Sequence, residues 1–219
     1  MRLRIEHWLR RAWPAPLLGL ILCHAQAEEK TEWRFNATLD GKPIGVHRYN
    51  LQKQGADTYL NSEADFNVTF LHLSLYRYRH TANEHWRDSC LVSLDARTDE
   101  KKIVSTVRGE QQADGFLLQD AVGTRKLPST CISSFAYWNI ELLQQKRLLN
   151  PQTGEWTPVS VEALGTDPIQ SSKRTIAARR YRLQAGKQRI DLWYTADNQW
   201  VGLQSTTPDG RLITYQLIE

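Results

Sequence analysis

Histidines are the residues of this sequence best suited to acid–base or metal chemistry, and His47, His72, His80 and His85 stand well inside the chain. None of them forms a His-x-x-x-His pair or another short-spaced ligand set, so we predict no metal site. The chain carries no nucleophile elbow, phosphate loop or dinucleotide fingerprint, and therefore no cofactor is expected. An enzyme remains the alternative hypothesis, and it would need a buried polar cluster around His80, His85 and Asp88.

Two of the three cysteines, Cys90 and Cys131, are predicted to form a disulfide. An even pair of cysteines usually bridges in an oxidising compartment. Closing a loop of this length stabilises a fold by about 4 kcal/mol in the chain-entropy model. The bridge would also remove the thiol that Cys131 would need as a nucleophile with His85 as its base.

The stretch from Tyr76 to His80 alternates aromatic and cationic side chains. One interpretation is a ligand-facing rim, in which Arg77 and Arg79 meet an anionic head group. The other is an ordinary strand with its aromatic residues packed inward and its arginines solvated. Both interpretations stay open at this stage.

Large aromatic residues recur on the apolar side of the alternating segments, as expected for a protein with an apolar pocket or a packed core. We expect a ligand-binding lining from five of them: Trp33, Phe35, Phe66, Trp86 and Trp138. Pockets for small ligands are mainly apolar with a few polar groups. The same alternation would serve a solid core, so the lining is a hypothesis.

The first 27 residues have the order of a secretory signal peptide. A basic start is followed by a short apolar run, Leu17–Leu22, and by Ala25-Gln26-Ala27 before the polar Glu28. The run is shorter than the roughly 20 apolar residues that span a bilayer. We expect cleavage after Ala27 and a periplasmic protein with no membrane span; lipid attachment at Cys23 is the alternative.

The expected mature chain, residues 28–219, is nearly neutral, with 24 basic and 23 acidic residues. This balance gives no argument for nucleic acid or an anionic membrane as a partner. The sequence identifies no protein partner. At this length the chain can form one domain with a substantial core.

Period-two alternation dominates residues 28–219 and predicts a mainly β domain. Trp33, Phe35, Ala37 and Leu39 alternate with polar residues, and Asp40-Gly41-Lys42-Pro43 then turns the chain. Similar segments separated by turns continue to the C-terminus. We predict a single curved antiparallel meander sheet, a half-barrel or open barrel, because a sheet of about ten strands must curl, split or close.

One helical insert is predicted over Ser133–Gln145. Phe135, Trp138, Leu142 and Leu143 recur there at near-helical spacing, and Ser133 or Ser134 could cap the start. Packed against the concave side of the sheet, this segment would act as a plug or as a core anchor.

Several motifs together resemble an uncharacterised family of bacterial exported proteins known only as a domain of unknown function. They are Leu39–Gly45, Tyr76–His80, Cys90–Asp99 and Phe135–Asn139. The opening hairpin and the meander are also similar to the lipoprotein-carrier fold of the LolA/LolB type, a curved half-barrel closed by helix. That second resemblance implies binding of a lipid or acyl chain in a concave apolar cavity.

The leading hypothesis from the sequence is a periplasmic, non-enzymatic protein that binds a lipid-like or apolar ligand in the concave sheet. The alternatives are a small cell-envelope enzyme acting on lipid or cell-wall material, and a structural module that binds a partner in an envelope complex. The module would show an exposed apolar patch or a bare sheet edge.

Overall fold

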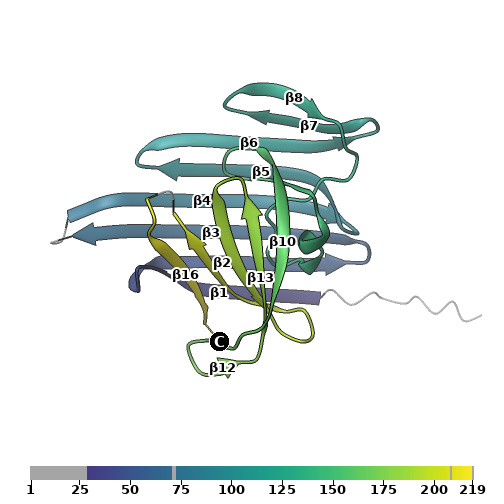
Figure 1. The fold of residues 1–219 in the computed structure, drawn as a ribbon. Helices are drawn as coiled ribbons and strands as arrows, with labels where there is room; N and C mark the ends of the chain where they lie inside the picture. The colour runs from purple at the N-terminus through teal and green to yellow at the C-terminus, as the bar shows by residue number, and fades with distance from the viewer. Residues whose placement is uncertain (1–28, 71–72, 208, 219) are drawn as a thin grey trace, which may run out of the picture.

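The structure is a computed structural model that describes residues 29–70, 73–207 and 209–218 (Figure 1). The expected signal peptide and Cys23 lie outside the described residues, as does His72.

The chain is built almost entirely of β-strands. The first eight are β1 Glu29–Leu39, β2 Lys42–Gln54, β3 Asp57–Phe70, β4 Leu73–Arg87, β5 Cys90–Glu100, β6 Ile103–Gln112, β7 Gly115–Asp120 and β8 Gly123–Leu127. After one short 3₁₀ helix, η1 Ile140–Gln144, come β9 Arg147–Leu149, β10 Trp156–Thr166, β11 Ile169–Gln170, β12 Thr175–Ile176, β13 Arg179–Ala185, β14 Gln188–Tyr194, β15 Trp200–Thr206 and β16 Leu212–Leu217.

Fourteen strands form one antiparallel sheet in the order β8-β7-β6-β5-β4-β3-β2-β1-β16-β15-β14-β13-β10-β9. Strands β1 to β8 follow one another as hairpins. The two halves of the chain are joined where β1 pairs with β16, with Phe35 opposite Leu217. The prediction of one large curved antiparallel meander sheet, not fully closed, is confirmed.

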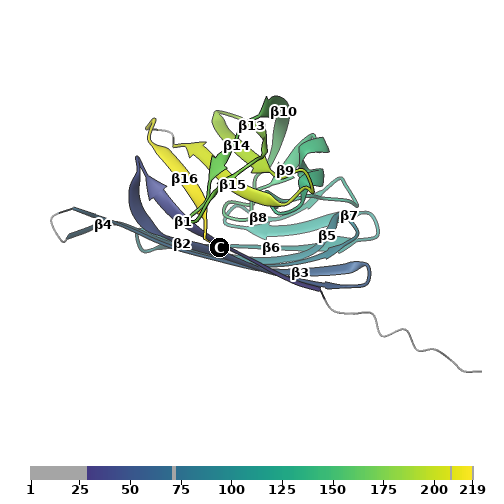
Figure 2. The ribbon, with the colours of Figure 1, turned by 90° about the horizontal axis from the view of Figure 1, so that it is seen from below.

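The sheet curls so that its second half lies over one face of the first (Figures 1 and 2). Register shifts interrupt the ladders at Ala37/Thr38, His85/Trp86 and Trp193/Tyr194, among other places. Extra residues of this kind bend a strand and increase its twist. The bends bring the inward faces of the two halves against each other.

The main core forms between these two faces. Phe35 on β1 packs against Trp200 on β15, with ring centroids 4.3 Å apart, and the ring of Tyr49 on β2 stands at right angles to Trp200. Leu142 and Leu148, from the segment between β8 and β10, are buried in the same cluster. Strands β1 to β5 therefore contribute alternate side chains to the interior, as the sequence pattern predicted, whereas β14 and β15 are buried on both faces.

The helix expected over Ser133–Gln145 is present only as η1, so most of that prediction is wrong. The backbone before it pairs with β9: Phe135 N–H donates to the Leu149 carbonyl, and Leu149 N–H donates to Ser133. Asn139 caps η1 by accepting from the Glu141 N–H. Hydrogen bonding to a strand thus replaces the helical bonds that the residue spacing alone suggested.

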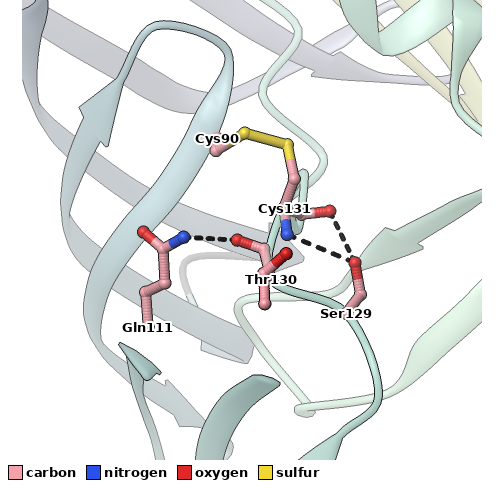
Figure 3. Close-up of a disulfide and its surroundings, with 5 residues drawn as sticks. All are labelled: Cys90, Gln111, Ser129, Thr130 and Cys131. Carbon is pink, nitrogen blue, oxygen red and sulfur yellow. Dashed lines mark hydrogen bonds between the residues drawn. A yellow bond between two sulfur atoms is a disulfide. The ribbon is translucent and has the colours of Figure 1, made fainter. Parts of the chain in front are cut away.

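A disulfide between Cys90 and Cys131 ties this connecting segment to the start of β5, as predicted (Figure 3). The two Cα atoms are 4.8 Å apart, within the range that a disulfide spans. Leu91 N–H donates to the Ile132 carbonyl beside it, and the Gln111 side chain donates to the Thr130 carbonyl. The segment is therefore held at its start by one covalent bond and two hydrogen bonds.

Two glycines with positive φ in the β1–β2 hairpin, Gly41 and Gly45, are expected to differ in how much a substitution by alanine destabilises the protein. A Cβ on Gly45 would lie 2.0 Å from the backbone oxygen of Asp65, whereas a Cβ on Gly41 would meet nothing within 4 Å. We expect Gly45→Ala to lower the free energy of unfolding by about 2 kcal/mol and Gly41→Ala by about 1 kcal/mol, because only the first adds a clash to the backbone strain. Urea denaturation of both variants measures this difference, and equal losses would contradict it.

Candidate functional site

A polar cavity of about 120 Å³, open to solvent beside the exposed Gln152 and Gln188, lies inside the curled sheet. Its wall combines the inward faces of β2, β3 and β4 with the segment that crosses the concave side. Twelve residues line it: His47, Tyr49, Ser62, His80, Ala82, Glu84, Phe135, Tyr137, Asn150, Pro151, Gln152 and Gln188. Such a concentration of polar side chains on the buried face of a sheet is unusual, because buried polar groups require partners.

His47 on β2 is fixed by three hydroxyl groups. Its Nε2 lies 2.8 Å from Ser62 Oγ, and its Nδ1 lies 3.0 Å from the Tyr215 hydroxyl and 3.1 Å from that of Tyr49. Burial, with a smaller contribution from His80, lowers the pKa of His47 well below its ordinary value. The ring is therefore a neutral hydrogen-bonding group at neutral pH.

His47 and Ser62 are as close as a catalytic base and its nucleophile, but the surroundings of His47 would not stabilise a positive charge on its ring. A histidine that takes a proton from serine becomes cationic and needs an anionic partner at its other nitrogen. In the described structure that nitrogen faces the phenols of Tyr49 and Tyr215, whose pKa values burial raises well above normal. This arrangement favours a binding network over acyl transfer.

His80 and Glu84 continue the polar wall along β4. His80 Nδ1 lies 2.9 Å from Thr98 Oγ1, and burial lowers the pKa of His80 to about 4. Glu84 is only 5% exposed and accepts hydrogen bonds from Trp86 Nε1 at 2.8 Å and from Ser134 Oγ at 3.1 Å. Burial raises the pKa of Glu84 to about 7, because its two donors only partly offset the loss of hydration.

Together these groups make a cavity that offers hydrogen bonds with little net charge at neutral pH. Both histidines are neutral, and Glu84 is close to half protonated. Perturbed pKa values gathered in one hollow are characteristic of functional sites.

The five aromatic residues expected to line a ligand pocket are placed in the hydrophobic core. Trp33, Phe35 and Phe66 belong to the main cluster, and Trp86 belongs to the neighbouring cluster around β4 to β8. Trp138 packs against both clusters, and its ring stands at right angles to that of Trp86 with centroids 5.6 Å apart. None of the five lines the polar cavity, and a ligand-binding role for them stays a prediction.

The structure does not bring Arg77 or Arg79 to this cavity. Both side chains are exposed on the opposite face of β4 from Tyr78 and His80, and Arg79 pairs with Asp65 at 3.2 Å. The placement corresponds to the second interpretation of this stretch, an ordinary strand with inward aromatic residues and solvated arginines.

The cluster required for the alternative enzyme, around His80, His85 and Asp88, is not formed. His80 is buried inside, whereas His85 lies on the outer face and bonds Asp57 at 2.7 Å. Asp88 is exposed in the turn between β4 and β5. The bulge at His85/Trp86 comes after both histidines, so the alternation between residues 80 and 85 separates them onto opposite faces.

Sequence reasoning missed His47, Ser62 and Glu84 as cavity residues. The available signal was a polar side chain on the apolar side of an alternating segment. Glu84 stands between Ala82 and Trp86 in this way. A polar residue at a position where the strand alternation points the side chain into the core needs buried hydrogen-bond partners. Such a residue is a reason to suspect a functional site.

Within the described residues, no group of three or more His, Cys, Asp or Glu side chains is placed to hold a metal ion. The described part of the chain also has no helix with the length and apolar content needed to cross a bilayer.

Residues 35–218 match the model of a family described as a domain of unknown function, DUF6134. The chain belongs to this family. The expected membership in a domain of unknown function is thereby confirmed. No curated protein matches the DUF6134 chain.

Among solved structures, the DUF6134 chain is similar to the crystal structure of a β-barrel-like protein of another domain of unknown function, DUF1849, from Brucella abortus. The two share 10% sequence identity with a TM-score of 0.63, over 86% of this chain and 95% of the other. At this identity the similarity shows the fold alone. The resemblance to lipoprotein carriers is not confirmed and stays a prediction.

Proposed function

We propose that this protein is an exported cell-envelope protein that binds a small uncharged group through hydrogen bonds in the interior polar cavity, without catalysing a reaction. The observation that carries the proposal is the interior cavity with His47, Ser62, His80 and Glu84 on its wall. In a concave site, a small number of precisely placed polar groups fixes the orientation of the ligand and makes its binding specific.

The electrostatics of the wall favour an uncharged ligand. At neutral pH the two histidines carry no charge, so an anion entering the cavity would meet no cation there. A cation could meet only the partly ionised Glu84. Burying an unpaired charge is far more costly than burying a hydrogen-bonded neutral group.

The size of the cavity narrows the lipid hypothesis drawn from the sequence. Pockets that enclose a drug-sized ligand measure roughly 300–1,000 Å³, and this cavity measures about 120 Å³. It fits a small molecule or the polar end of a lipid-like one. An acyl chain would have to displace the segment around Phe135 and Tyr137.

Export is supported by the disulfide, which persists in oxidising compartments, and by the order of residues 1–27. Expression of the full chain in a bacterium, followed by N-terminal sequencing of the protein from the periplasmic extract, tests this part of the proposal. We expect the mature protein to begin at Glu28. Recovery of the uncleaved chain from the cytoplasm would overturn the export proposal.

Binding is tested by native mass spectrometry of the periplasmic protein, compared with the variant Ala82→Val. Ala82 lines the cavity between His80 and Glu84, so the added methyl groups would occupy the space of the ligand. We expect the wild-type protein to carry one additional small mass per chain and the variant to carry none. A wild-type protein with no bound mass would contradict the proposal.

Ala96→Val is the matched control, because Ala96 lies opposite Ala82 on β5 in the same hydrophobic cluster but does not line the cavity. We expect Ala96→Val to lower the free energy of unfolding by about 1–3 kcal/mol through overpacking, and Ala82→Val to lower it by less. Urea denaturation of the two variants checks the difference. Equal losses would mean that the hollow beside Ala82 offers no room for a ligand.

A further inference from the structure

A second hollow lies on the outer face of the sheet, away from the interior cavity. It measures about 480 Å³, within the usual range for ligand sites, and crosses strands β2 to β5. Figure 2 shows the second half of the chain on the other side of these strands. The hollow therefore opens on the opposite face of the sheet from the interior cavity, and Glu84 is the one lining residue that the two share.

One cross-strand row in this hollow consists of amide side chains. Asn50, Asn61 and Asn83 are direct neighbours on β2, β3 and β4, and Asp95 follows on β5. Asn61 Nδ2 donates to Asn83 Oδ1 at 3.0 Å, which aligns the two amides. Each amide offers both donors and an acceptor, a combination that suits hydroxyl and acetamido groups.

The adjacent cross-strand row carries an aromatic ring, Tyr59, that stacks on a histidine of the neighbouring strand. Gln52, Tyr59, His85 and Ser93 are direct neighbours across the same four strands. Tyr59 is 41% exposed and stacks on His85, with ring centroids 4.6 Å apart and planes 8° from parallel.

His85 is itself fixed by an ion-paired carboxylate. Its Nε2 bonds Asp57 at 2.7 Å, and Arg87 contacts the same carboxylate at 3.0 Å. The position of the Tyr59 ring is thus set before any ligand arrives, and this preorganisation lowers the entropy cost of binding.

The hollow continues along the sheet into a neighbouring one of about 350 Å³. The two share Ser93, Leu94 and Asp95. In the second hollow, the same cross-strand row extends through Arg108, Gln119 and Thr124 on β6, β7 and β8, and Gln119 adds a fourth amide. Seven strands at their usual spacing give a trough of about 29 Å, long enough for a chain of several sugar rings.

The charges of the trough argue against a polyanionic ligand. Of the exposed large apolar side chains in the described residues, only Tyr59 lines either hollow. Arg108 is paired with Asp95 at 3.6 Å, and no cationic stripe is present in the described trough to attract a polyanion. Amides with one exposed ring suit a neutral, hydroxyl-rich chain whose C–H faces can pack on an aromatic surface.

We propose that this outer trough binds an uncharged glycan chain laid across strands β2 to β8. The amide row would meet its hydroxyl or acetamido groups, and Tyr59 would support one sugar ring. The inference does not depend on the interior cavity.

Isothermal titration calorimetry of the mature protein, with its disulfide intact, tests the proposal. The probes are uncharged oligosaccharides of four to six units: N-acetylglucosamine oligomers, cello-oligosaccharides and malto-oligosaccharides. We expect at least one series to bind, with affinity rising with length. Preference for the N-acetylglucosamine oligomers would indicate recognition of acetamido groups, and absence of binding by all three series would overturn the proposal.

Variants locate the binding. Tyr59→Ala and Asn83→Ala should each weaken binding at least tenfold, while Tyr59→Phe should retain most of it because the ring is kept. The matched control is Thr81→Ala, exposed on the same face of β4 but outside both hollows. Thermal melts establish that each variant is folded, and equal affinity of wild type and Tyr59→Ala would contradict the assignment.

The interior variant Ala82→Val separates this inference from the proposed function. It should abolish the mass bound inside and leave glycan affinity unchanged. A loss of glycan affinity in Ala82→Val would place the sugar in the interior cavity and contradict the proposal that the outer trough binds it.

Discussion

Replacing both Cys90 and Cys131 with serine is expected to lower the free energy of unfolding by about 4 kcal/mol. The bridge closes a loop with a sequence separation of 41 residues, and its main effect is to restrict the unfolded chain. The Leu91–Ile132 hydrogen bond beside it can form without the disulfide. We therefore expect the variant to fold with the same topology at reduced stability.

Urea denaturation at 25 °C with and without dithiothreitol measures this effect. Reductant should destabilise the wild-type protein by about as much as the double substitution and should leave the double variant unchanged, which provides the matched control. A double variant as stable as the oxidised wild type would show that the connecting segment is held by its packing alone.

Glu84→Gln is expected to raise stability relative to the wild type as the pH increases from 4.5 to 7. Folded Glu84 keeps its proton up to about pH 7, whereas an ordinary glutamate releases it near 4.5. The folded state therefore binds more protons in this window, so the wild-type protein loses stability as the pH rises. The shift corresponds to about 3 kcal/mol, fully lost above pH 7.

The two interior histidines change the stability with pH in the opposite direction. The informative quantity is therefore the difference in stability between Glu84→Gln and the wild type at each pH. The pKa of His80 falls from 6.5 to about 4 on folding, and that of His47 also falls, so both favour the folded state as the pH rises through this range. Glutamine can still accept from Trp86 and bond Ser134, which keeps the local contacts of Glu84.

Urea denaturation of both proteins between pH 4 and 8 supplies the measurement. Glu63→Gln, on the exposed face of β3, is the control for removing a carboxylate without a buried site. If the difference between Glu84→Gln and the wild type is the same at pH 5 and pH 8, Glu84 ionises as an ordinary surface residue does.

The strands could be predicted from the sequence because a sheet with one buried face imposes a period of two. Trp33, Phe35, Ala37 and Leu39 all face the core as that period requires. The disulfide was also predictable, because two cysteines remain after an expected signal peptide. The curl was expected only in general terms, since its direction depends on bulges such as that at His85/Trp86, which leave no mark in the composition.

The site was harder to predict than the fold. Aromatic residues that fill a core and aromatic residues that line a cavity follow the same pattern, so Phe35 and Trp86 could not be assigned to either. The cavity contains residues distant in sequence, such as Ser62 and Gln188, which only the curled sheet brings together. The helix over Ser133–Gln145 was wrong for a related reason: pairing with Leu149 outweighs the local spacing.

Because β1 pairs with β16, the first strand of the sheet cannot complete its hydrogen bonding until the last strand has been synthesised. His47 and Tyr215, whose side chains meet beside this seam, are 168 positions apart, so their contact forms only when nearly the whole chain has emerged. Synthesis delivers the N-terminal hairpins first, and β1 then has one ladder edge unpaired until β16 arrives. Such non-local pairing slows folding to the millisecond-to-second range. During that interval the exposed edge of β1 is open to pairing with another chain.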